Sequence, residues 1–201
     1  MKDSTLGKLF QQHHGQLRMI EAINAGVSRK QLYSWRDKNL ITPISRGIYR
    51  LSSLPSLSNH DFVVISLRFP KSVICLLSAL AYHRLTTHIP HAVDVAVLRT
   101  TRLPRLTFPP VHAHRFSEPC FSIGIQIDVI DEVSVRIYNP EKTLIDCFKF
   151  RHKIGMDIFL EALERYKKIF PLRVNQLLEY AQLCRVKKAI VPYLESILCQ
   201  K

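Results

Sequence analysis

The sequence predicts an α+β fold, and the spacing of its apolar residues is the main reason. In the first fifty residues, and again after Pro140, apolar residues recur at the spacing of an α-helix. From about residue 92 they alternate with polar residues, as in "VDVAVL", "VHAHRF", "SIGIQIDVI" and "VSVRIY", which indicates an antiparallel sheet with one covered face. A run of strands between two groups of helices favours α+β over a doubly wound sheet.

Two short helices are expected at the start of the chain, and each is ended by a glycine. Gly15 follows the first helix and Gly26 follows the second. Their apolar stripes consist of Leu6, Leu9 and Phe10 in the first helix, and of Leu17, Ile20 and Ile23 in the second.

A third helix is predicted from Ser28, which is a suitable N-cap, to Asn39, which tolerates the left-handed conformation of a C-cap. A rotation of about 100° per residue places Gln31, Leu32 and Trp35 on one side. The opposite side carries Arg29, Lys30, Tyr33, Ser34 and Asp37. One face of this helix is therefore assigned to a core, and the other is free to bind a partner.

The next segment, "LITPISRGIYRL", predicts two short strands joined by a tight turn near Arg46 and Gly47. Ile44, Ile48 and Leu51 are available to pack inward. Three helices followed by a hairpin, with a short basic third helix, outline a winged helix-turn-helix. We therefore assign residues 1–54 to a winged helix-turn-helix DNA-binding domain.

A second domain, of antiparallel sheet plus C-terminal helices, is predicted over residues 58–201. The serine-rich segment "SSLPSLSNH" at 52–60 is the best candidate for the boundary. Apolar helices are expected at "DFVVISLRF" and "SVICLLSALAYHRL", before the strands. After the strands come "EKTLIDCFKF", "MDIFLEALERYKKIF", "VNQLLEYAQL" and "VKKAIVPYLESIL", the last kinked or shortened by Pro192.

The charge of the chain favours a polyanionic partner, because the formal net charge is +13 over 201 residues. It amounts to +6 in residues 1–51, +2 in 52–140 and +5 in 141–201, and is thus concentrated at the two ends. No apolar run reaches the roughly 20 residues needed to cross a bilayer. The five cysteines are scattered without a C-x-x-C pair, which indicates free thiols in a reducing compartment. We expect a cytoplasmic protein with no membrane partner.

A winged helix-turn-helix binds DNA with its third helix in the major groove and its wing along the backbone. In that arrangement Arg46 and Arg50 would anchor the wing, and Arg36 would suit a phosphate. Asp37 is expected beside Lys38 or at the edge of the contact, because phosphates repel a carboxylate. The predicted DNA-binding residues are Ser28, Arg29, Lys30, Tyr33, Ser34, Arg36, Arg46 and Arg50. The alternative is a basic helix face that is merely solvated.

The histidines give only a weak signal for a metal site. His83, His88 and His91 cluster near an expected helix end, and His112 and His114 share a strand that is followed by Cys120. Their spacing matches no standard zinc motif, and ordinary surface histidines explain them equally well. We expect neither a metal nor a cofactor.

Signals for an enzyme are also weak. The sequence contains no nucleophile elbow and no glycine-rich phosphate loop. The remaining alternative is a winged-helix, metal-dependent nuclease using Asp94, Asp128 and Asp131 on or beside strands, but no lysine follows an acid at Glu-x-Lys spacing. A protein-interaction adaptor is a third possibility. We predict that the protein is not an enzyme.

In "PEKTLIDCFKFRHKIG", Lys142 and Asp146 lie four residues apart and are expected to pair on one helix. One interpretation is a solvated salt bridge at the start of a helix. The other is a surface that the protein uses.

At these residues the chain resembles the AbiEi family of bacterial antitoxins, the regulator halves of bicistronic phage-defence (abortive infection) and toxin–antitoxin loci of type IV. The segments that carry the resemblance, in order, are "SRGIYRL", "VICLLSALAYHRLTTHIP", "PEKTLIDCFKFRHKIG", "ALERY" and "AQLCRVKKAIVPYLE". The resemblance covers nearly the whole chain, and it depends on the order and spacing of these segments together.

The resemblance implies a transcriptional repressor that binds inverted repeats in double-stranded DNA upstream of its own operon. It also implies a C-terminal domain that counteracts a nucleotidyltransferase toxin without forming a stable complex with it. Trp35 and Tyr33 stand where plainer residues are expected, so base specificity does not carry over. A second DNA or antitoxin surface is expected in the tail, at Lys142, Asp146, Lys149, Arg151, Lys153, Arg185, Lys187 and Lys188, although solvated helix faces would also explain its basic residues.

Overall fold

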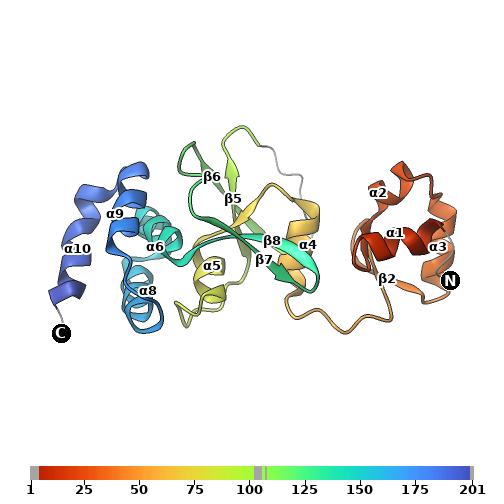
Figure 1. The fold of residues 1–201 in the computed structure, drawn as a ribbon, viewed down its shortest axis with the longest axis horizontal. Helices are drawn as coiled ribbons and strands as arrows, with labels where there is room; N and C mark the ends of the chain where they lie inside the picture. Colours follow the sequence, from red (N-terminus) through yellow and green to blue (C-terminus); the bar gives the residue numbers. More distant parts are fainter. Residues whose placement is uncertain (1–4, 102–105, 107, 200–201) are drawn as a thin grey trace. The chain divides into compact units, whose positions relative to one another are not determined.

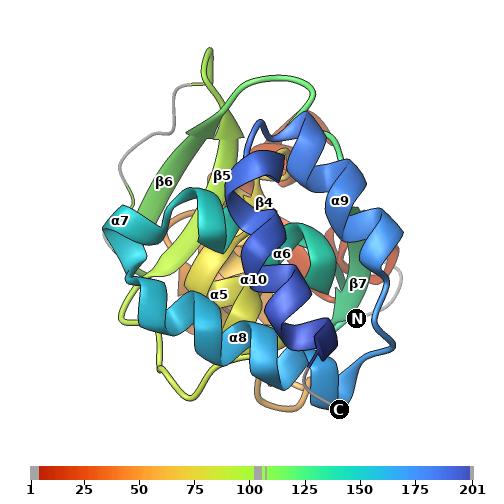
Figure 2. The same ribbon diagram turned by 90° about the vertical axis from the view of Figure 1, so that its left-hand side faces the viewer.

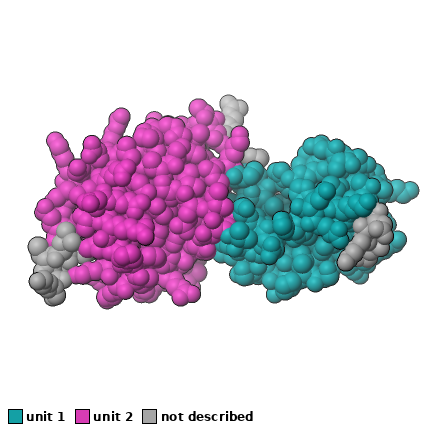
Figure 3. Space-filling view, in the orientation of Figure 1, with its two compact units in different colours: residues 1–70, 129–134 teal, residues 71–128, 135–201 magenta. Residues whose placement is uncertain are grey.

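The structure is a computed structural model that describes residues 5–101, 106 and 108–199. It confirms the α+β class, with helices around two sheets. The described chain forms two compact units (Figure 3): unit 1 lies within residues 1–70 and 129–134, and unit 2 within residues 71–128 and 135–201. No helix in the described ranges is long and apolar enough to cross a membrane.

Unit 1 contains the helices and the hairpin expected of a winged helix-turn-helix (Figure 1). The helices are α1 (Thr5–Gln12), α2 (Met19–Asn24) and α3 (Arg29–Asp37). The wing is the antiparallel hairpin of β2 (Ile41–Ser45) and β3 (Ile48–Leu51). A further strand, β1 (Gln16–Arg18), pairs antiparallel with β3, so the sheet order is β1-β3-β2.

Strand β1 corrects the prediction for the second helix. Leu17 belongs to β1, opposite Tyr49, and not to the helix. His14 and Gly15 have positive φ angles of 51° and 80°, which redirect the chain before the strand. Ile20, expected in the apolar stripe, is 55% exposed. Helical spacing over so short a segment does not distinguish a three-residue strand from the first turn of a helix.

Helix α3 begins and ends where the sequence predicts. The Ser28 hydroxyl accepts a hydrogen bond from the Gln31 amide at 3.3 Å, and the Gln31 side chain accepts one from the Ser28 amide at 2.9 Å. This capping box satisfies two donors that a helix N-terminus leaves free. Asn39 follows the helix with a φ of 54°. Leu32 is fully buried, and Trp35 stacks on Phe10 with ring centroids 6.1 Å apart.

Helix α4 (His60–Arg68) completes unit 1 and lies along the wing. Asn59 caps it by accepting a hydrogen bond from the Phe62 amide at 3.0 Å. His60 Nε2 lies 3.1 Å from the Ile44 carbonyl oxygen at one end of the helix, and Arg68 Nη1 donates to the Arg46 carbonyl oxygen at 3.0 Å at the other.

A turn at residues 129–134 also belongs to unit 1. Asp131 and Glu132 have positive φ angles of 48° and 66°. The Asp131 carboxylate accepts bonds from the Ser58 amide and hydroxyl, at 2.9 and 3.0 Å, and Gln16 donates to the Asp131 carbonyl oxygen at 2.6 Å. These hydrogen bonds hold the strained turn in place. They also fix the irregular segment that precedes α4.

Unit 2 is built on a five-stranded sheet of order β6-β5-β4-β8-β7. Its strands are β4 (Val73–Ile74), β5 (Val93–Leu98), β6 (Val111–Phe116), β7 (Ile125–Ile130) and β8 (Val133–Tyr138), of which 129–134 are counted with unit 1. The predicted antiparallel sheet is in fact mixed, since β4 runs parallel to β8 and β5 runs parallel to β6. Alternation of apolar and polar residues reports a covered face but carries no strand direction.

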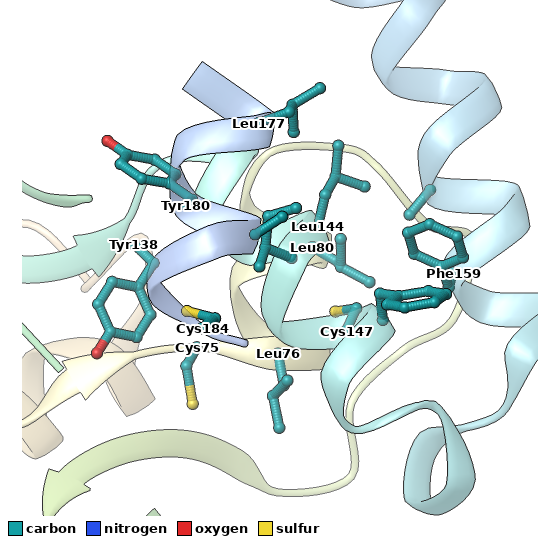
Figure 4. Packing of buried hydrophobic residues seen from close by; sticks show 14 of the residues in the cluster. Cys75, Leu76, Leu80, Tyr138, Leu144, Cys147, Phe159, Leu177, Tyr180 and Cys184 are labelled. Carbon is teal, nitrogen blue, oxygen red and sulfur yellow. The ribbon is translucent and has the colours of Figure 1, made fainter. Parts of the chain in front are cut away.

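The helices of unit 2 are α5 (Leu76–Tyr82), α6 (Pro140–Lys149), α7 (Arg151–Ile154), α8 (Met156–Ile169), α9 (Val174–Leu183) and α10 (Lys187–Cys199). Figure 2 shows α8, α9 and α10 on the side that faces the viewer. Helix α6 packs against α5, α8 and α9, and all its residues from Pro140 to Phe148 are buried. In Figure 4, Leu80 of α5, Leu144 and Cys147 of α6, and Phe159 of α8 converge in this core. Pro192 lies inside α10, which continues to Cys199.

Candidate nucleic-acid interface

Helix α3 presents a basic and aromatic face. Arg29, Lys30 and Tyr33 are exposed and Ser34 is half-buried, whereas Leu32 points into the core. Gln31, expected on the core side, is exposed because its side chain is used in the capping box. The exposed side chains of α3 are therefore available to a partner along one face of the helix.

Next to this face lies the arginine groove, a hollow of about 610 Å³ between α3, the wing and α4. Helix α3 contributes Arg29, Tyr33 and Arg36, the wing contributes Arg46, and α4 contributes Arg68. The full lining is Met19, Arg29, Tyr33, Arg36, Pro43, Ile44, Ser45, Arg46, Gly47, Tyr49 and Arg68. Four guanidinium groups and two phenol rings thus line one groove, and no acid is among the lining residues.

Arg36 is the member of the groove with an acidic neighbour. Its Nη2 lies 2.8 Å from Asp37 Oδ1, and its guanidinium carbon lies 4.9 Å from the centre of the Tyr33 ring. The hydrogen bond to Asp37 raises the pKa of Arg36, which is charged in any case. Asp37 was expected beside Lys38 or at the edge of the contact; its carboxylate pairs with Arg36 and is not among the residues that line the groove. Both groups are exposed, so the pair contributes little to stability and leaves Arg36 free to rearrange toward a phosphate.

Arg50 does not belong to this surface, and its predicted role as a wing anchor on DNA is wrong. It is 7% exposed, and its Nη1 donates to the Leu54 carbonyl oxygen at 3.3 Å. In β3 it is paired with Gln16 of β1 and Thr42 of β2, so it occupies the central strand of the sheet. Alternation along the strand turns its side chain to the opposite face from Tyr49, which lines the groove.

Residues 5–52 match the family described as "Transcriptional regulator, AbiEi antitoxin". The resemblance drawn from the sequence is confirmed over this segment, which holds α1 to α3 and the wing. No curated protein matches the chain.

A solved structure described as "Crystal structure of RV2827C protein from Mycobacterium tuberculosis" is similar in fold. The two chains share 11% sequence identity with a TM-score of 0.60, over 90% of this chain and 71% of the other. At this identity the likeness extends to the fold alone. It places an α+β protein beside this chain over nearly its whole length.

The pair expected as a functional surface of the tail, Lys142 and Asp146, is fully buried, and that prediction is wrong. Both side chains are 0% exposed, and Lys142 Nζ donates to Asp146 Oδ2. The ammonium also lies 4.2 Å from the Tyr138 ring centre and 4.9 Å from that of Phe116. The spacing identified the pairing correctly. The rings of Phe116 in β6 and Tyr138 in β8 face the ammonium, and α6 as a whole is packed against α5, α8 and α9, so the pair is removed from solvent.

The other basic residues of the predicted second surface lie in three settings. Lys149 and Arg151 are half-buried: Lys149 Nζ lies 3.8 Å from Cys120 Sγ, and Arg151 Nη1 donates to the Phe148 carbonyl oxygen at 2.9 Å. Lys153 is exposed with its ammonium 5.7 Å from the Phe150 ring centre. Arg185, Lys187 and Lys188 are exposed around the start of α10.

The acids required by the nuclease alternative are separated into three environments. Asp94 Oδ1 lies 2.7 Å from His114 Nε2, and the Asp128 carboxylate accepts a bond from the Tyr82 hydroxyl at 2.9 Å. Asp131 holds the Ser58 amide. Within the described ranges, no group of three or more His, Cys, Asp or Glu residues is arranged to hold a metal ion.

His83 and His88 have separate partners, whereas His112 and His114 both lie near Asp94. His83, 9% exposed, places Nε2 2.7 Å from the Tyr138 carbonyl oxygen, and burial lowers its pKa. His88 Nδ1 lies 3.5 Å from Glu161, and His112 Nδ1 lies 3.8 Å from Asp94. Sequence reasoning missed Arg68 altogether, because no local signal connects a helix end at residue 68 with a wing that ends at residue 51.

Proposed function

We propose that the protein is a DNA-binding transcriptional autorepressor and the antitoxin of a bicistronic toxin–antitoxin operon. Residues 5–52 match a family of transcriptional regulators and antitoxins. The arginine groove carries the DNA part of the proposal, because four cations line it with no acid among its walls. Such a surface favours a polyanion, and the winged helix-turn-helix presents it beside α3, the helix that enters the major groove in this fold.

The contacts are assigned by position. The residues of the basic and aromatic face of α3 would reach base edges or nearby phosphates; they are Arg29, Lys30, Tyr33 and Ser34. Arg36 at the flank of α3 and Arg46 on the wing would bind backbone phosphates. Ser28 would contribute its position at the helix start, since its hydroxyl already caps α3. Arg50 is left out of the interface because it is buried.

A gel-shift titration with the DNA upstream of the protein's own gene tests this proposal. If Lys30 and the groove arginines of α3 and the wing, Arg29, Arg36 and Arg46, meet phosphates, affinity should fall by about two decades between about 50 and 200 mM salt. The double variant Arg29→Ala plus Arg46→Ala should weaken binding roughly a hundredfold and reduce the salt slope by about 1.8. Arg99→Ala, which removes one charge from an exposed side chain outside the groove, is the matched control.

Two other results would contradict the proposal. DNA that is cut when a divalent metal is supplied, and left intact in EDTA, would favour the nuclease. A double variant that shifts DNA as well as the native chain would favour an adaptor that does not use this face.

The antitoxin part concerns the neighbouring gene. We propose that the functional partner is a nucleotidyltransferase toxin encoded downstream, that no stable complex forms, and that both proteins act in the cytoplasm. The thiols of Cys75, Cys120, Cys147 and Cys184 are free and buried, as suits a reducing compartment. Growth of cells expressing the toxin with and without this protein tests the proposal, and failure to restore growth would overturn it.

A further inference from the structure

Arg68 is the member of the arginine groove that comes from outside the winged helix-turn-helix segment. It is the last residue of α4, whereas Arg29, Arg36 and Arg46 lie within residues 5–52. Its guanidinium donates to the Arg46 carbonyl oxygen at 3.0 Å. We propose that Arg68 is part of the DNA interface: it positions the wing and binds a backbone phosphate. This inference rests on the proposed DNA-binding function.

The tip of the wing is held from two directions. The Arg46 carbonyl oxygen accepts the bond from Arg68, and the Gly47 carbonyl oxygen accepts one from the Met19 amide at 2.8 Å. Gly47 has a φ of 74°, a conformation that glycine adopts without strain. The backbone that carries the Arg46 side chain is therefore fixed on both sides of the turn, which reduces the entropy lost when that side chain binds DNA.

Helix α4 is anchored along the wing at both of its ends. From His60 to Arg68 the helix rises about 12 Å, and its two terminal side chains reach the carbonyl oxygens of Ile44 and Arg46. The capping of α4 by Asn59 fixes its N-terminus. Arg68 is thus presented by a rigid element, as a phosphate-binding residue needs to be.

A purely structural role leaves the charge of Arg68 unexplained. One hydrogen bond to a carbonyl group needs no cation, yet Arg68 adds a fourth guanidinium to a groove in which Arg36 has the Asp37 carboxylate beside it. A polyanion in the groove would be attracted by this accumulation of positive charge. A guanidinium has five N–H donors, and the bond to Arg46 takes one of them. The remaining donors suit the oxygens of a phosphate.

The test is the same gel-shift titration, with the native chain, Arg68→Ala, Arg68→Lys and the control Arg99→Ala. We expect Arg68→Ala to weaken binding about tenfold on every DNA sequence and to reduce the salt slope by about 0.9, the loss of one phosphate contact. Arg68→Lys should keep the native slope because it keeps the charge. It should still bind less tightly than the native chain, because an ammonium lacks the planar fork that reaches carbonyl and phosphate together.

The possible failures are distinguishable. If the native chain shifts no DNA even at low salt, the proposed function itself fails, and this inference with it. If the native chain binds but Arg68→Ala keeps its affinity and slope, or changes them no more than Arg99→Ala does, the inference is overturned and the proposed function stands. If Arg68→Ala loses affinity with an unchanged slope, Arg68 acts on the wing alone and the phosphate contact is refuted. Circular dichroism checks that each variant is folded.

Discussion

The two units of the protein differ in where they place positively charged side chains. In unit 1, four arginines line an open groove with no acid among its walls. In unit 2, Lys142 is wholly buried, bound to Asp146 and faced by the rings of Tyr138 and Phe116. Exposed cations that line one open groove favour an external anion, whereas a buried cation must carry its partner within the fold. Basic side chains are therefore open to an external anion in unit 1, whereas Lys142 in unit 2 is enclosed together with its partner.

The buried pair has an energetic cost that the exposed cations avoid. Burial raises the pKa of Asp146, and the neighbouring Lys142 ammonium opposes that rise. Asp146 Oδ1 has no hydrogen-bond partner among the described residues. A pair of this kind contributes little net stability over an apolar replacement, but each member depends strongly on the other.

The largest expected effect follows from separating the pair. Lys142→Met should destabilise the protein by about 3–5 kcal/mol, because it leaves the Asp146 carboxylate buried without its cation. Arg29→Ala, which removes an exposed cation from α3, should change stability by no more than about 0.5 kcal/mol. Urea unfolding followed by circular dichroism measures both. The single tryptophan, Trp35, reports on unit 1 by fluorescence in the same titration.

A double variant separates the loss of the pair from the loss of packing. Lys142→Met with Asp146→Leu removes both charges and should return the protein to within about 1 kcal/mol of the native stability, or above it. Equal losses in the single and double variants would show that shape, and not charge, determines the cost at this position.

A smaller effect is expected in the pH dependence of Lys142→Met. Without the ammonium, nothing from residue 142 opposes the effect of burial, so the pKa of Asp146 rises further above its ordinary value of 3.8. The folded variant then binds a proton that the unfolded chain releases, and its stability must fall as the pH rises between those two pKa values. The deficit relative to the native chain should therefore narrow as the pH falls from about 7 to about 5. A deficit that widened over this range would contradict the assignment of the buried charge to Asp146.

The sequence predicted those parts of unit 1 that depend on local signals. Ser28 and Asn39 bound α3, and Arg46 and Gly47 turn the wing, because capping and turn residues act within a few positions of themselves. The three-residue strand at Leu17 was missed because it is shorter than one period of the helical pattern. The parallel pairs in unit 2 were missed because strand direction depends on long connections between strands.

The candidate site was predicted in part, for the same reason. The exposure of Arg29, Lys30 and Tyr33 follows from the periodicity of one helix. The burial of Lys142 depends on how α6 packs against the sheet, where Phe116 and Tyr138 face the ammonium, and the approach of Arg68 to the wing depends on how α4 packs. The four-residue spacing of Lys142 and Asp146 predicts that they pair but not what covers the helix, so both interpretations of the sequence placed the pair at the surface.

Arg50 lies in unit 1, like the groove arginines, but it is buried, like Lys142. Its replacement should have the smallest effect on stability and on DNA binding. It is buried in the central strand of the unit 1 sheet, its Nη1 donates to the Leu54 carbonyl oxygen, and its Nε has no hydrogen-bond partner among the described residues. Arg50→Met would lose one hydrogen bond of about 1 kcal/mol but would also release a buried guanidinium from its desolvation cost. We expect stability equal to that of the native chain or up to about 1 kcal/mol higher, and an unchanged salt slope in DNA binding, because Arg50 does not face the groove. A loss of DNA affinity in a variant of native stability would return Arg50 to the interface and show that the wing opens when DNA binds.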